Sequence, residues 1–412
     1  MASRFPLRDL APTEELLLVC AHPDASPQWR ARIARLCEKE IHWPRLLDLG
    51  IRHGVSALLY RALGAESGVP DDAREQLLLT YTRRAARNLL LARELTRILA
   101  AFEAGGIPVF VHKGLAIASQ AYRDITLRHV GDLDLVIGKE NLGRARTILV
   151  SSGYRCKAAR SDDGAYHEVL CRSSPEIVVE LHWAFTRAEW PLRVPWDVLW
   201  SRCIFTQVAN VPVPCLDPAL GILALCAHGG KEGWSRLALV ADLAALIHQH
   251  PGLDWGWILQ QARRMERERM LLLGLSLAEV LLAGAGSAAP EGALGALPPS
   301  VFERIEANAA VRHLSRLVWR SLLSAQPLRG FDYHRTMWLL AENPAGQARY
   351  AAHAVTQLPR RVANLLHPTE NDLQSVSLPS RLSFFYYVVR PLRLLHTYRH
   401  PFALVKTAIR RL

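Results

Sequence analysis

The sequence is poor in the features that mark secreted proteins and small zinc domains. It holds only seven cysteines, and no two of them have the spacing of a CxxC pair. An odd, unpatterned set of cysteines is typical of reduced thiols and not of a disulfide framework or a zinc site. The first residues, MASRFPLRDLAP, contain no apolar core of a secretory signal. We therefore expect a cytoplasmic protein.

Long hydrophobic runs are also scarce. The one stretch long enough to suggest a membrane span is MLLLGLSLAEVLLAGAGSAA, which starts at Met270. Glu279 lies in its middle, and the charged segment RRMERER precedes it. A transmembrane helix needs about 20 mainly apolar residues with few charges. The stretch therefore predicts a buried helix, and no stable membrane span is expected.

Size and charge set the remaining limits. The chain has 412 residues, of which 50% are hydrophobic and 21% are charged, with a formal net charge of +12. This composition excludes wholesale disorder, and the length favours more than one subdomain. The positive charge favours a polyanionic partner, whether a nucleotide, a nucleic acid or a membrane surface, and does not choose among them.

The periodicity of the chain predicts a mixed α+β fold. A small mixed sheet with helices on one side follows from the strand and helix patterns between IPVFVHKG and VVELHWAF. Helical patterns flank it on both sides. The predicted regions are an N-terminal helical region at 1–105, an α/β core at 106–215, a helical region closing the active site at 216–295, and a C-terminal helical region with a basic tail at 296–412.

Three acidic residues stand out within the predicted sheet. Asp132 and Asp134 lie in the otherwise apolar run HVGDLDLVIG, and Glu180 ends the apolar strand PEIVVEL. Residues two apart on a strand share a face, so paired carboxylates would repel unless a cation compensates them. Magnesium with oxygen ligands is the usual cation, and three carboxylates suit a two-metal site for phosphoryl transfer. Glu176 shares the face of Glu180 and is a weaker substitute.

Basic residues near this run are candidates for phosphate binding. Lys113 and Gly114 lie where a strand turns into a helix, and a helix N-terminus favours anions. Arg123 and Arg128 lie close by in the sequence. Arg128 is the better candidate, and its competing role is a salt bridge to one of the aspartates.

Three further groups have open alternatives. His182 could be a base or a phosphate donor, or it could hydrogen-bond to a carboxylate of the metal site. The helical spacing of His228, Lys231 and Trp234 suggests a wall of the nucleotide site with Lys231 on a phosphate, or else an exposed helix end. The C-terminal segment from Phe384 could contact a membrane surface or a nucleic acid, or it could pack its aromatic side chains on the core.

The run IPVFVHKGLAIASQAYRDITLRHVGDLDLVIG, followed by VVELHWAF, resembles the nucleotidyltransferase superfamily typified by DNA polymerase β and the minimal nucleotidyltransferases. More narrowly, it resembles a bacterial group of nucleotidyltransferase family proteins, which carry a Lys-Gly turn, an Asp-x-Asp-Leu strand and an acidic-Leu-His-Trp strand. The resemblance spans roughly residues 40 to 250.

The resemblance implies a fold and a set of roles. Asp132 and Asp134 would bind two Mg²⁺ ions, with Mn²⁺ as an alternative, Glu180 would bind one of them, and Gly114 would contact the phosphates. The chain departs from the wider superfamily at Leu115, where a small or hydroxyl residue is usual, and in its longer gap from Gly114 to Asp132.

Two hypotheses of different classes follow. The first is a Mg²⁺-dependent enzyme that moves AMP from ATP, the expected nucleotide, to a hydroxyl or phosphate of an acceptor and releases pyrophosphate. The acceptor could be a small molecule, a peptide, a protein or RNA. The second is a catalytically degenerate module of the same fold that binds a partner protein or a nucleic acid.

Overall fold

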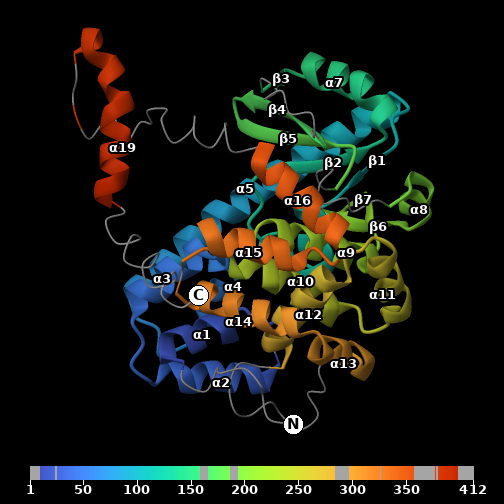
Figure 1. Ribbon diagram of the computed structural model, residues 1–412. Coiled ribbons are helices and arrows are strands. Elements are labelled where there is room, and N and C mark those ends of the chain that lie inside the picture. Colours follow the sequence, from blue (N-terminus) through green and yellow to red (C-terminus); the bar gives the residue numbers. More distant parts are fainter. Residues whose placement is uncertain are drawn as a thin grey trace. The chain divides into compact units, whose positions relative to one another are not determined.

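The computed structural model describes residues 10–23, 26–157, 166–185, 194–283, 297–324, 326–356, 376 and 379–397. The chain divides into two compact units, Met1–Gln347 and Ala348–Leu412. The first unit contains the sheet and the helices around it (Figure 1). Helix α16, Pro344–Thr356, begins in the first unit and ends in the second.

The N-terminal region is helical, as its periodicity predicts. Its helices are α1 (Pro12–Cys20), α2 (Pro27–Cys37), α3 (Trp43–Arg52), α4 (Ser56–Leu63) and α5 (Asp71–Ala104). Helix α5 is 34 residues long, begins after Pro70 and ends at Gly105. Residue preferences account for both ends, because Pro is tolerated at a helix start and Gly106 adopts a left-handed conformation after the end.

Among the described residues, the first unit contains a mixed sheet of seven strands in the order β3-β4-β5-β2-β1-β7-β6. The strands are β1 (Val109–Val111), β2 (Leu133–Ile137), β3 (Arg155–Cys156), β4 (His167–Ser173), β5 (Glu176–His182), β6 (Cys203–Val208) and β7 (Val211–Leu216). The strands β2 and β5 are parallel, whereas β4 pairs with β5 in the antiparallel direction. The sequence interpretation placed β1, β2, β4 and β5 and missed β3 and the hairpin of β6 and β7.

One face of the sheet is covered by helices, which matches the prediction. The helices are α5, α6 (Leu115–Tyr122) and α7 (Leu142–Ser151), and the last follows the short 3-10 helix η1 (Lys139–Asn141). Alternate residues of the strands, among them Leu133, Leu135 and Leu181, join side chains of these helices in one buried cluster. The opposite face carries the residues between them, so Asp134 and Glu180 point away from this cluster.

The second face is partly covered near β1. Phe110 of β1 is fully buried and stacks on Trp196 of α8 (Trp196–Ser201), with ring centroids 5.7 Å apart. An aromatic pair of this kind is stabilised by both burial and ring geometry. The acidic end of β2 lies further along the same face, since Phe110 pairs with Val136.

Helices follow the sheet, as predicted from the periodicity after Asp217. They are α9 (Pro218–Lys231), α10 (Leu237–Gln249), α11 (Trp255–Arg264), α12 (Glu268–Leu282), α13 (Pro299–Ala307), α14 (Ala309–Leu323) and α15 (Gly330–Leu340). Residues 270–282 of the suspected apolar stretch lie in α12 and are buried except for the half-buried Glu279, while residues 284–289 of the stretch lie outside the described residues. Among the described residues, no helix is long and apolar enough to cross a membrane.

The second unit contains the 3-10 helix η2 (Ser380–Phe385) and helix α19 (Tyr386–Thr397). A proline, Pro391, lies inside α19. The alternatives for the C-terminal basic segment concern residues 384–412, of which 398–412 lie outside the described residues.

Candidate active site

The acidic residues meet because two strands run parallel and in register. Asp134 of β2 pairs with Glu180 of β5, and both side chains point to the face opposite the helix-covered core. Asp132 comes directly before β2. The sheet therefore brings Asp132 and Asp134, at the start of β2, beside Glu180, near the end of β5. Glu176 is exposed at the opposite end of β5 and does not join them.

Asp134 is the most buried of the three and has two basic partners. Its side chain is 6% exposed, Lys113 Nζ donates to its Oδ1 over 3.2 Å, and His182 Nε2 lies 2.9 Å from the same oxygen. Burial by itself would raise the pKa of Asp134, but Lys113 and His182 outweigh it and hold the pKa well below its usual range. Asp134 is therefore ionised at neutral pH.

Asp132 behaves in the opposite way. Burial, together with the charges of Asp134 and Glu180, raises the pKa of Asp132 to about 6. The positive charges of Lys113 and Arg128 only partly oppose this shift. Like-charged carboxylates that share a site are compensated by a bound cation, so these oxygen atoms are a suitable donor set for a hard divalent ion.

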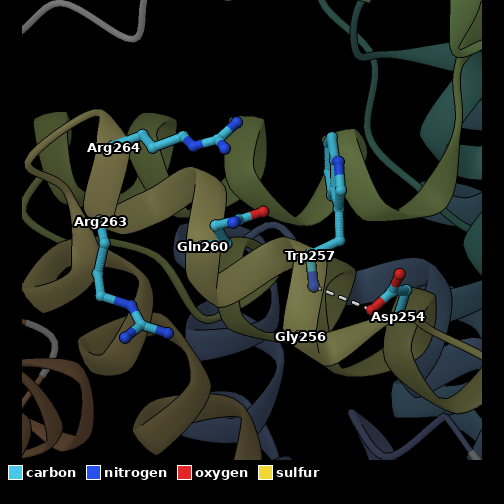
Figure 2. A pocket seen from close by; sticks show the side chains of 6 residues that line it. All are labelled: Asp254, Gly256, Trp257, Gln260, Arg263 and Arg264. Carbon is cyan, nitrogen blue, oxygen red and sulfur yellow. Dashed lines mark hydrogen bonds between the residues drawn. The ribbon is translucent and has the colours of Figure 1, made fainter.

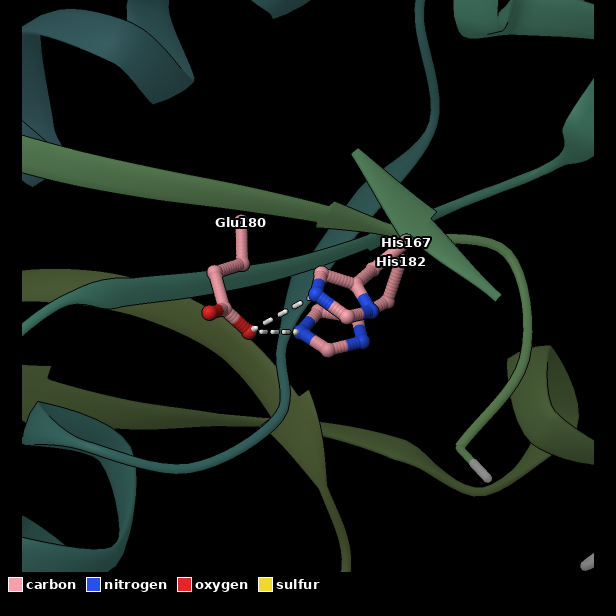
Figure 3. Close-up of side chains that lie close together, drawn as sticks. All are labelled: His167, Glu180 and His182. Carbon is pink, nitrogen blue, oxygen red and sulfur yellow. Dashed lines mark ion pairs between the residues drawn. The ribbon is translucent and has the colours of Figure 1, made fainter. Parts of the chain in front are cut away.

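Two histidines lie next to Glu180. His182 Nε2 lies 3.1 Å from Glu180 Oε2, and His167 Nε2 of β4 lies 3.9 Å from the same oxygen (Figure 3). Burial lowers the pKa of His182, but its bonds to Asp134 and Glu180 outweigh burial and raise it. Of the roles left open for His182, the structure shows the hydrogen bonds to the carboxylates.

The turn before α6 has the conformation that only glycine adopts easily. Gly114 has φ +56° and ψ −120°, and it immediately precedes the first residue of α6. A Cβ atom there would lie 3.3 Å from Cγ1 of Val130. Leu115, the departure from the superfamily pattern, is 1% exposed and belongs to the buried core. Its side chain is therefore used in packing, while its backbone remains at the helix N-terminus.

Arg128 does not pair with Asp132 or Asp134. Its Nε donates to Asp242 Oδ2 over 2.8 Å, and Tyr122 donates its hydroxyl to Asp242 Oδ1 over 3.0 Å. The Arg128 and Asp242 side chains are 13% and 3% exposed, so this is a largely buried ion pair. The competing structural role proposed for Arg128 is thus present, but with a partner on α10. Arg123 is exposed and donates to Gln249.

Helix α9 brings two basic residues toward the acidic end of the sheet. Lys231 Nζ donates to the Tyr166 hydroxyl over 3.0 Å. Burial, Lys113 and Lys231 together lower the pKa of His228, and Asp134 partly opposes them. The expectation that Trp234 shares the face of these residues is wrong. Helix α9 ends at Lys231, and Trp234 is 1% exposed, enclosed by Gly229 and Gly274.

The sequence interpretation missed several residues of this cluster. His167 faces His182 directly across the antiparallel pair of β4 and β5, and their ring centroids are 5.1 Å apart. His112 follows β1 and lies 6.2 Å from His182 by ring centroids. His112 directly precedes Lys113, so its place near the site could be inferred from the sequence. The pairing of His167 with His182 could not, because it depends on the strand register.

A separate hollow lies on the surface of α11. It has a volume of about 700 Å³ and is lined by Asp254, Gly256, Trp257, Gln260, Arg263 and Arg264 (Figure 2). Asp254 caps the helix by accepting from the backbone N–H of Trp257. Arg202 lies over the Trp257 ring at 3.8 Å. Asp132, Asp134 and Glu180 do not line this hollow.

The structure thus brings three carboxylates together where the start of β2 lies beside the end of β5, close in the chain to a glycine turn before a helix. The family described as an uncharacterised nucleotidyltransferase matches residues 39–283, more than half of the chain. The chain belongs to this family and is a nucleotidyltransferase, which confirms the resemblance found in the sequence.

Two solved structures are similar to part of the chain. The solution structure of the antibiotic-resistance factor ANT(2'')-Ia is 16% identical, with a TM-score of 0.32, and covers 43% of this chain and 91% of that one. The crystal structure of ANT(2")-Ia in complex with adenylyl-2"-tobramycin is 16% identical, with a TM-score of 0.33, and covers 43% of this chain and 97% of that one. No curated protein matches the chain.

Proposed function

We propose that the protein transfers AMP from ATP to a hydroxyl or phosphate of an acceptor molecule, with Mg²⁺ bound, and releases pyrophosphate. The observation that supports this most strongly is the pairing of Asp134 with Glu180 in register, with Asp132 beside them. Burial and, after it, the charges of Asp134 and Glu180 raise the pKa of Asp132, so a bound cation would stabilise its ionised form. Asp132, Asp134 and Glu180 would hold the metal ions.

The reaction requires few groups from the protein. An acceptor oxygen attacks the α-phosphorus, the bond from that phosphorus to the oxygen of the leaving pyrophosphate breaks, and the acceptor proton passes to solvent. Bound magnesium would lower the pKa of the acceptor hydroxyl and neutralise the triphosphate. No side chain is assigned as a general base.

Basic groups around the carboxylates would bind the triphosphate. The backbone at Gly114 and the N-terminus of α6 favour phosphate oxygens. Lys113 has a flexible side chain that can leave Asp134 when a cation binds there and reach a phosphate instead. Lys231 approaches from α9, Arg128 adds positive charge behind the carboxylates, and His182 hydrogen-bonds to Asp134.

The site can be tested by isothermal titration of Mg·ATP. Asp132→Asn and Asp134→Asn should lose binding and activity while keeping the fold, as judged by circular dichroism. Asp197→Asn is a matched control, because Asp197 is an exposed aspartate in the first turn of α8. If both site variants bind Mg·ATP like the parent protein, the assignment of the site is wrong.

The acceptor can be found by incubating cell extract with the protein and isotopically labelled ATP. Mass spectrometry should then detect a product that carries the labelled nucleotide, and the same product should be missing with Asp132→Asn. Small molecules, peptides, proteins and RNA are all compatible acceptors. The seven free cysteines support a reducing compartment such as the cytoplasm as the place of the reaction.

One observation favours a second candidate, a module that binds a partner without catalysis. Lys113 and His182 already compensate the charge of Asp134, so the fold tolerates this carboxylate without a metal ion. Absence of heat on titration with Mg·ATP would support this candidate. A salt-dependent mobility shift with RNA or DNA would then identify a polynucleotide partner, consistent with the net charge of +12.

A further inference from the structure

Three potential metal ligands converge beside the carboxylates on the open face of the sheet. One ligand atom each from His167, Glu180 and His182 lies within 4.8 Å of the other two. Figure 3 shows both imidazole rings directed toward the same Glu180 oxygen. Only Glu180 belongs to the set expected to hold magnesium, so the two histidines add a different kind of donor.

The geometry of the sheet holds these three residues in place. His167 and His182 are direct cross-strand partners in the antiparallel pair of β4 and β5, and Glu180 lies two residues before His182 on the same face. The two rings are nearly parallel, with an interplanar angle of 24°. Because the ladder between the strands continues for seven residue pairs, the ligands need little reorganisation to close around an ion.

Ligand chemistry indicates which ion fits. Magnesium takes oxygen ligands almost exclusively, whereas imidazole nitrogen suits zinc, cobalt, nickel and copper, and also manganese and iron. Two histidines and one carboxylate are a ligand set used by zinc in enzymes. We propose that His167, Glu180 and His182 bind one divalent transition-metal ion of the zinc and cobalt type, next to the oxygen site of Asp132 and Asp134.

Two of the three proposed ligands are partly exposed to solvent, and the third is buried. The side chains of His167 and Glu180 are 24% and 23% exposed, which leaves a path for an ion from solvent. The His182 side chain is 2% exposed and also contacts Asp134. A neutral imidazole is needed for coordination, so the proton that His182 shares with the carboxylates leaves to solvent as the ion binds.

This inference deepens the proposed function and rests on it in one respect, namely the role of the ion in nucleotidyl transfer. Glu180 would be shared by a nitrogen-containing site for a transition metal and an oxygen site for magnesium. The protein would then be activated by a mixture of ions more strongly than by Mg²⁺ alone. Metal binding itself does not depend on nucleotide and can be measured separately.

The test uses the full-length protein, first stripped with a chelator, and Co²⁺ as a spectroscopic probe. We expect one Co²⁺ per chain with the visible absorption of a nitrogen-ligated ion, and Zn²⁺ should displace it. His167→Ala should weaken binding at least tenfold, because one of three protein ligands is lost. His167 is half-buried at the start of β4, so the variant should fold, which circular dichroism will check.

Two control variants separate this site from its surroundings. His129→Ala removes an exposed histidine close to Asp132 in the sequence and should leave Co²⁺ binding unchanged. Asp132→Asn should lose Mg·ATP binding but keep Co²⁺ binding, since Asp132 is not one of the three ligands. Glu180→Gln should weaken both.

The results that overturn the proposal are distinct from those that overturn the function. Failure of the parent protein to bind Co²⁺ or Zn²⁺, or equal affinity in the parent and His167→Ala, rules out the transition-metal site even if Mg·ATP binds. An equal loss in His129→Ala points to nonspecific binding by surface histidines and also rules it out. Absence of Mg·ATP binding with an intact, His167-dependent cobalt site leaves this inference standing and removes the proposed function.

Discussion

Replacing Asp132 by asparagine should stabilise the fold while it destroys the site. The pKa of Asp132 is raised from 3.8 to about 6 by burial and by the charges of Asp134 and Glu180. A shift of this size corresponds to an upper limit of about 3 kcal/mol of destabilisation when Asp132 is ionised. Asparagine has nearly the same shape and no charge, so Asp132→Asn removes this cost.

The sign of the pH dependence follows from the direction of the shift. Because the folded state holds the proton of Asp132 more tightly than the unfolded state does, parent stability falls as pH rises from about 4 to about 6. The advantage of Asp132→Asn should be complete above pH ~6 and should vanish below pH ~4. We expect a gain of about 1–3 kcal/mol at pH 8, since neighbouring groups relax around the charge.

The assay is urea unfolding, followed by circular dichroism, of the parent, Asp132→Asn and the control Asp197→Asn at pH 4.5, 6 and 8. Magnesium should stabilise the parent more than Asp132→Asn, because the ion compensates a charge that the variant lacks. An Asp132→Asn protein that is less stable than the parent at pH 8 would refute the reasoning. An unchanged difference between parent and variant across the pH range would refute it equally.

Three further changes test other parts of the structure. Gly114→Ala should cost about 1–3 kcal/mol in urea unfolding, because its φ of +56° is strained for alanine, and an unchanged stability would contradict the backbone argument. Asp242→Asn should lower the free energy of unfolding by about 3–5 kcal/mol, because it leaves the buried charge of Arg128 without its partner. The double variant Arg128→Met, Asp242→Leu should recover part of this loss. If the costs of changing the two residues simply add, the ion pair does not contribute as proposed. Glu279→Gln should raise thermal stability at pH 8 but not at pH 4. Burial raises the pKa of Glu279 to about 7, so ionisation of Glu279 destabilises the fold as pH rises. Equal effects at both pH values would contradict this.

The acidic pattern was readable from the sequence because strands have a period of two. Asp132 and Asp134 in an apolar run, and Glu180 at the end of another, predict carboxylates on one face wherever these segments are strands. The glycine turn was readable for a similar reason, since the change from strand to helix at Gly114 requires an unusual backbone conformation. The ends of α5 are also set locally, since Pro70 precedes its first residue and Gly105 follows its last.

The partners of these residues were not readable, because they depend on which strands and helices become neighbours. The parallel pairing of β2 with β5 sets Asp134 against Glu180, and the antiparallel pairing of β4 with β5 brings His167 to His182. The packing of α10 on α6 gives Arg128 a carboxylate partner, Asp242, that lies 114 residues away. The end of α9 at Lys231 turns Trp234 into the core.

The sequence by itself thus determined the kind of chemistry, because local periodicity decides which side chains share a face of a strand. Tertiary structure decided which side chains from other strands and helices lie beside these carboxylates. The register of β4 against β5 placed His167 beside Glu180 and His182 and so added a second nitrogen donor to the site. The register of β2 against β5, which sets Asp134 beside Glu180, arises from contacts between segments that are distant in the chain, and no local pattern of residues specifies it.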